Sequence, residues 1–122
     1  MTSEGYRELR VWQSAMKLAE AVYSASRAFP ARETYGMTSQ LRRAAVSVPA
    51  NIAEGRSRDH TPDYLRYLSI ARGSLAETET LLELAARFGY LLPDQHQELM
   101  SLAASTGRQL LALRKSMAEA RT

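Results

Sequence analysis

The chain has 122 residues, a net charge of +3 at pH 7, 45% hydrophobic residues and no cysteine. This length suits one domain with its own hydrophobic core, and the lack of cysteine excludes disulfide bonds and thiolate zinc sites. No run approaches the roughly 18 consecutive apolar residues of a membrane span, and the first five residues lack the pattern of a secretory signal. We therefore expect one cytoplasmic domain over residues 1–122, with no membrane partner.

Apolar residues recur at three- and four-residue intervals in four long stretches, and this period predicts α-helices rather than strands. Proline and glycine separate the stretches at Pro30, at residues 55–62 and at residues 89–93. The predicted helices cover residues 9–28, 35–54, 62–88 and 94–118. Short connections between long helices predict an all-α, antiparallel up-down-up-down four-helix bundle with a core over about residues 6–117.

The second predicted helix contains a proline in its middle. Pro49 removes one backbone hydrogen bond and crowds the carbonyl of Ala45, so a kink should follow. Gly55 is expected to end this helix. In the third helix, Thr61 is a candidate N-cap ahead of Pro62, and Gly89 is the expected residue after the last turn.

The fourth predicted helix carries a heptad seam typical of coiled-coil packing. Its members step by three and four residues and are Leu99, Leu102, Thr106, Leu110, Leu113, Met117 and Ala120.

Polar residues line one flank of the apolar stripe of the second helix. They are Gln40, Ser47, Asn51 and Glu54, spaced by seven, four and three residues. In one interpretation this polar seam binds a ligand or nucleic acid. In the other it is structural: it satisfies the carbonyl freed by Pro49 and pairs with polar residues of a neighbouring helix, such as Arg72 or Glu77.

The third and fourth helices are more apolar around their circumference than a bundle core requires. One interpretation is a subunit interface, since the surplus occurs on two separate helices. The other is that single apolar residues are often exposed and that tyrosines reach out to water. The candidate interface residues are Tyr67, Ile70, Leu81, Phe88, Met100 and Leu111.

The excess positive charge lies in residues 1–60, because residues 61–122 carry seven basic and seven acidic side chains. Four arginines near the two ends of the second helix are candidates for binding RNA or DNA: Arg42, Arg43, Arg56 and Arg58. Arginine suits bidentate phosphate contacts, although a codon-biased genome would give the same preference for arginine over lysine. If they bind nucleic acid they should converge on one surface of the assembly. If not, they should form salt bridges within or between subunits with Glu33, Glu54 or Glu77.

Motifs of catalysis are missing from the sequence. There is no Glu-x-x-His, no glycine-rich phosphate loop and no nucleophile elbow. Arg56 precedes His60 with three intervening residues, whereas HEPN-type helical ribonucleases have four to six. We therefore expect no enzyme activity, no catalytic residue, no cofactor and no metal site.

Several segments resemble one bacterial family of four-helix bundle proteins, whose genes were first noticed within intervening sequences of 23S ribosomal RNA. They are residues 7–13, 29–30, 33–55, 70–77 and 89–91, and the run Ser-x-Pro-x-Asn-Ile-Ala-Glu-Gly over residues 47–55 is the most specific. The resemblance implies a cytoplasmic bundle that assembles into a ring-like homopentamer.

The same resemblance implies kinship with the accessory protein of diversity-generating retroelements, a basic pentamer that engages a reverse transcriptase and nucleic acid. It therefore favours a non-enzymatic, oligomeric RNA- or nucleic-acid-binding accessory or scaffold protein. A reverse transcriptase is an expected partner only in a retroelement context. The alternative is a structural or protein–protein interaction module that does not bind nucleic acid.

Overall fold

The computed structural model describes residues 5–120, so the start of the chain, where no secretory signal is expected, lies outside the described residues. Every regular element in this range is helical, which confirms the all-α prediction. The elements are the 3-10 turns η1 (Tyr6–Glu8) and η2 (Ala31–Glu33) and the helices α1 (Arg10–Ser26), α2 (Met37–Arg56), α3 (Thr61–Arg87) and α4 (Pro93–Ala120). Each predicted helix boundary lies within two residues of the observed one.

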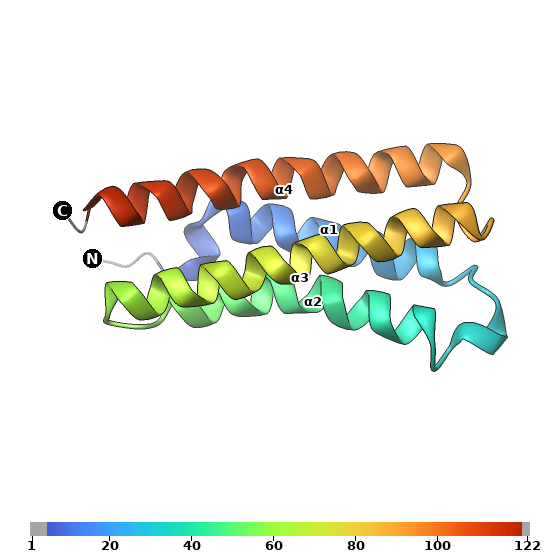
Figure 1. Ribbon diagram of the computed structural model, residues 1–122, viewed down its shortest axis with the longest axis horizontal. Helices are drawn as coiled ribbons and strands as arrows, with labels where there is room; N and C mark the ends of the chain where they lie inside the picture. The colour runs from blue at the N-terminus through green and yellow to red at the C-terminus, as the bar shows by residue number, and fades with distance from the viewer. Residues whose placement is uncertain (1–4, 121–122) are drawn as a thin grey trace.

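The four helices form an antiparallel bundle (Figure 1). Consecutive helices pack against each other and α4 returns to α1, so the contacts join each helix to its two neighbours. The start of α1 and the end of α4 lie at the same end of the bundle, here called the terminal end. The opposite end, where α1 meets η2 and α3 meets α4, is called the loop end. In this arrangement the α1–α2 face and the α3–α4 face are on opposite sides of the bundle.

Leucines from all four helices form the centre of the core. Leu18, Leu41, Leu68 and Leu110 have at most 1% of their surface exposed. Full burial of each such side chain contributes about 1.5–3 kcal/mol. The buried threonines of α3 and α4 keep their hydroxyls paired, because Thr106 donates to the carbonyl of Leu102 at 2.9 Å and Thr78 bonds its own helix in the same way. The predicted heptad seam of α4 thus contributes to the core through Leu99, Thr106 and Leu110.

The C-terminal end of α3 agrees with the sequence prediction, and its N-terminal cap does not. Gly89 has a left-handed backbone (φ 81°) and follows the last turn as predicted. Thr61 is the first residue of the helix, however, while His60 occupies the cap position and makes no capping bond through its side chain. The predicted N-cap was therefore one residue too late.

Helix α2 differs from the prediction at its end. It continues through Pro49 and through Gly55 to Arg56, so Gly55 does not end the helix. A Cβ atom on this glycine would lie 2.8 Å from Cβ of Tyr67 and 3.1 Å from Cδ1 of Tyr64. At Gly55 the backbone of α2 therefore approaches α3 too closely for a larger residue to fit without a shift. The bend at Pro49 stays a prediction.

Candidate functional site

The four candidate arginines do not form one cluster. They lie on or just after α2, and Arg42 and Arg56 are separated by 14 residues, which is about 21 Å along a helix. Arg42 and Arg43 belong to the half of α2 near the loop end, and Arg56 and Arg58 to the terminal end. The two pairs are therefore separate within one chain, and their convergence on one surface of the assembly stays a prediction.

Arg42 is held against the neighbouring helix α1. Its Nε donates to Oγ of Ser26 at 2.8 Å, and its guanidinium lies 4.5 Å from the ring centre of Tyr23. A stacked guanidinium of this kind gains both cation–π attraction and packing. Arg42 thus joins α1 to α2, while Arg43 is exposed and donates to Oγ of Ser39 in its own helix at 3.3 Å.

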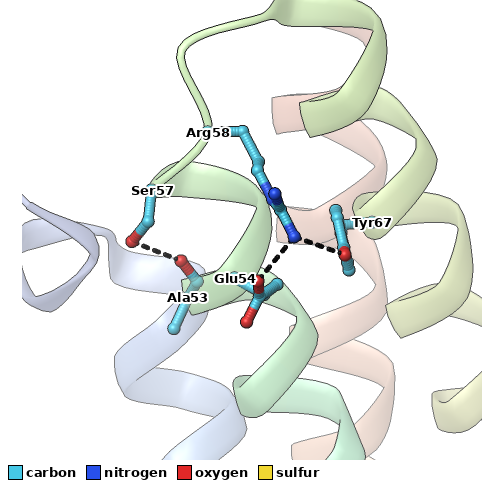
Figure 2. A network of polar contacts seen from close by, with 5 residues as sticks. All are labelled: Ala53, Glu54, Ser57, Arg58 and Tyr67. Carbon is cyan, nitrogen blue, oxygen red and sulfur yellow. Dashed lines mark hydrogen bonds and ion pairs between the residues drawn. The ribbon is translucent and has the colours of Figure 1, made fainter.

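Arg58 lies between a carboxylate and a tyrosine (Figure 2). Its Nη2 donates to Oε2 of Glu54 at 2.8 Å and to the hydroxyl of Tyr67 at 2.8 Å. The hydrogen bond to Tyr67 raises the pKa of Arg58, and the charge of Glu54 acts in the same direction. Arg66 also lies over the Tyr67 ring, at 4.6 Å. Tyr67, predicted as an interface residue, thus contacts two guanidinium groups.

Arg56 and Arg58 line one cavity of about 380 Å³ at the terminal end of the bundle. The cavity reaches Thr61, where α3 begins, and the buried Tyr64. Burial raises the pKa of Tyr64, while the nearby positive charge of Arg56 opposes this shift. The other lining residues are Leu9, Asp59, Leu113 and Met117. This is the place where the structure brings two of the four predicted arginines together.

The polar seam of α2 is part of the α2–α3 contact. Oγ of Ser47 lies 2.8 Å from Oγ of Ser74, and Nδ2 of Asn51 donates to the carbonyl of Ser47 at 2.8 Å and to its hydroxyl at 2.9 Å. The partner on α3 is thus Ser74 rather than Arg72 or Glu77. The carbonyl that Asn51 satisfies is that of Ser47 rather than that of Ala45. Ser47 and Asn51 therefore fit the structural interpretation, whereas Gln40 is exposed and Glu54 bonds Arg58.

The candidate interface residues separate into exposed and buried ones. Ile70 and Phe88 of α3 and Leu111 of α4 are 41%, 55% and 50% exposed, and Met100 is partly buried. Leu81 is only 8% exposed and belongs to the core, so its assignment to an interface was wrong. The prediction also missed Leu84, which is 37% exposed and lies four helical turns after Ile70 on nearly the same side of α3.

Titratable groups near the loop end form a small network. His96 of α4 lies 3.1 Å from Oε1 of Glu83, whose Oε2 accepts from Nε of Arg87 at 3.1 Å. The hydrogen bond from Arg87 is the main reason that the pKa of Glu83 is lowered. Over residues 5–120, no three side chains of His, Cys, Asp or Glu are grouped so that they could hold a metal ion.

No helix in the described part of the chain combines the length and apolar character that a membrane span needs.

Comparison with known proteins identifies relatives by sequence and by fold. The sequence model of one family, described as 23S rRNA-intervening sequence protein, matches residues 7–112. The chain is also similar to a solved structure from Bacteroides thetaiotaomicron, described as a protein with unknown function from the S23 ribosomal protein family. That likeness has a TM-score of 0.78 at 24% identity, covers 86% of this chain and 95% of the other, and concerns the fold. Comparison with curated proteins yields no match.

Proposed function

The chain belongs to the 23S rRNA-intervening sequence protein family, and we propose that it is a non-enzymatic scaffold that assembles from several copies of itself. The observation that carries this proposal is the apolar surface of α3 and α4, where Ile70, Leu84, Phe88 and Leu111 are exposed in a single chain. Burying apolar surface on association is favourable by roughly 25 cal/mol per Å² before the costs of association. A homopentamer is the assembly we propose, in line with the family resemblance.

The contacts of the arginines support the hypothesis of a scaffold better than the hypothesis of a nucleic-acid-binding surface within one chain. Arg58 is bonded to Glu54, and Arg42 is bonded to Ser26 of α1. Both guanidinium groups therefore already have partners inside the bundle, as expected for the protein-interaction alternative.

Two charge insertions, one on α3 and one on α4, test the proposed assembly. Ile70→Glu and Leu111→Glu should each lower the mass measured by light scattering, because a carboxylate would have to be buried in the contact. Circular dichroism should show that both variants keep their helices. Ala112→Glu is the matched control, since Ala112 is exposed next to Leu111 but lines a groove between α1 and α4. Unchanged mass in both variants would contradict the proposal.

Nucleic-acid binding is a second candidate function, favoured by the cavity that Arg56 and Arg58 share at the terminal end. In a ring of identical subunits this cavity would be repeated, and linked weak sites gain affinity without any new contact. Binding would be mainly electrostatic, since no groove-reading motif or set of stacking aromatics accompanies the arginines. Single-stranded and structured RNA are the probes to use first.

The test of this second function is a titration at about 50 and 200 mM salt, where binding through several phosphate contacts should weaken by orders of magnitude. The double variant Arg56→Glu/Arg58→Glu should lose binding at the lower salt concentration. Lys17→Glu/Arg108→Glu is the charge-matched control, because it reverses two exposed charges that do not line the cavity. Equal loss of binding in both double variants would mean that net charge alone is responsible.

A further inference from the structure

A second apolar groove lies between α1 and α2, on the side of the bundle opposite to the α3–α4 face. Its volume is about 370 Å³, and Met16, Tyr23, Val46 and Pro49 form its apolar lining. The first three of these side chains are exposed, while Pro49 is buried beneath them. The four residues come from two helices that the chain packs side by side, so the groove is a fixed feature of the fold.

The α3–α4 face carries a larger groove of about 530 Å³. Ala76 and Leu84 of α3 and Met100 of α4 supply its apolar lining, and Leu84 is exposed at its border. A single chain therefore presents two different apolar grooves on opposite sides, and each exposes large side chains to water.

The net charges around the two grooves have opposite signs, although each groove is lined by both acidic and basic residues. Arg27 lines the α1–α2 groove together with Glu20, and Arg42 and Arg43 lie on α2 beside Val46, so its surroundings are basic. The α3–α4 groove is lined by Glu79, Glu83 and Arg87, and the exposed Glu77 follows Ala76, so its surroundings are acidic. Opposite charges around two apolar surfaces favour their association and fix its orientation.

The two grooves also lie at the same level along the bundle. The α1 residues of the first groove run to the last turn of α1, and the α3 residues of the second run to Arg87, where α3 ends. Because α1 and α3 run in the same direction (Figure 1), both grooves are in the half of the bundle near the loop end. A neighbouring copy with a parallel axis can therefore place one groove against the other without sliding along the bundle.

We propose that the α3–α4 groove of one copy docks on the α1–α2 groove of the next, with Leu84 of the first close to Val46 of the second. This inference rests on the proposed self-assembly and adds which surfaces meet. The contact joins two different surfaces and is therefore heterologous, so repetition closes a ring or extends a chain. Equal axial level of the two grooves lets successive copies keep parallel bundle axes without a rise along them.

Cysteine cross-linking tests this contact directly, because the natural chain has no cysteine. The double variant Val46→Cys/Leu84→Cys should form, under mild oxidation, a ladder of disulfide-linked species up to the full assembly. Val46→Cys alone and Leu84→Cys alone should stay unlinked, and an equal mixture of these two single variants should give linked dimers and nothing larger. Ala112→Cys/Leu84→Cys is the control pair and should not cross-link.

Each other outcome contradicts the inference in a distinguishable way. Disulfide-linked dimers of one single variant would show that identical surfaces meet, as in an isologous contact. An oligomeric mass by light scattering with no Val46–Leu84 cross-link would contradict the groove pairing but leave the proposed assembly standing. A monomeric mass for the unmodified chain would contradict both.

Discussion

The hydroxyl of Tyr90 donates a hydrogen bond of 2.8 Å to Oε2 of Glu33, and this bond joins the loop after α3 to the turn before α2. The other carboxylate oxygen of Glu33 accepts from the backbone N–H of Met37, the first residue of α2, at 3.1 Å. The cap position of α2 is occupied by Gly36, which offers no side chain. Glu33 therefore supplies both the capping acceptor and a negative charge at the positive end of the helix dipole.

Replacing this carboxylate should make the stability of the fold depend less on pH. The hydrogen bond from Met37, followed by that from Tyr90, lowers the pKa of Glu33, so the folded state favours the ionised form. Its contribution is complete above the ordinary glutamate pKa of about 4.3 and is lost as the pH falls below that value. Glu33→Gln should therefore be less stable than the natural chain at pH 7, and the difference should shrink by pH 3. Urea unfolding midpoints at both pH values measure this, and a difference independent of pH would contradict it.

Two glycine substitutions should have effects of opposite sign. Gly55→Ala should destabilise the fold by about 1–3 kcal/mol, because its Cβ would lie 2.8 Å from Cβ of Tyr67. Gly73→Ala should stabilise it by about 0.5–1 kcal/mol, because no atom lies within 4 Å of the added Cβ and alanine favours the helix. Chemical denaturation at equal protein concentration measures both values. Similar effects at the two sites would mean that α2 and α3 are not in close contact at Gly55.

The seam between α2 and α3 should show energetic coupling. Ser47→Ala and Ser74→Ala should each cost about 1 kcal/mol, since each breaks the 2.8 Å bond between the two hydroxyls. The double variant should cost less than both single variants together, by about 0.5–1.5 kcal/mol. A double-mutant cycle from unfolding free energies gives this coupling. Strict additivity would mean that the hydroxyls do not interact in solution.

Two leucines on α3, three residues apart, should differ sharply in their effect on folding. Leu81→Ala should cost about 2–4 kcal/mol, because it opens a cavity at a side chain that is 8% exposed. Leu84→Ala should cost less than about 1 kcal/mol, because Leu84 is 37% exposed. Denaturation at the lowest usable protein concentration, where assembly contributes little, measures both. Comparable losses would place Leu84 in the core as well.

Periodicity and turn residues were sufficient to predict the helices, because both signals are local. Leu81 was assigned to an interface because a helical wheel shows how wide the apolar arc of α3 is but not which part the neighbouring helices cover. Gly55 was predicted to end the helix because glycine often does so. Its close approach to Tyr67 could not be predicted, because it depends on how α2 and α3 pack. The local sequence pattern of a helix does not predict which of its residues contact a neighbouring helix.

The convergence of the four arginines on one surface of the assembly stays a prediction. Two pairs of side chains separated by 14 residues on one helix cannot meet in a single chain, since the helix rises about 1.5 Å per residue. The bond between Glu33 and Tyr90 joins two residues that the sequence analysis did not connect. These residues are 57 positions apart, and no local sequence pattern connects them. The contact therefore becomes evident only from the folded structure.

The central claim is that this bundle assembles with copies of itself, and sedimentation equilibrium of the natural chain tests it most directly. At micromolar concentration we expect a single species with a mass near five times the 13.6 kDa of one chain. A mass of one chain throughout the micromolar range would contradict it and would make the apolar residues of both grooves ordinary surface.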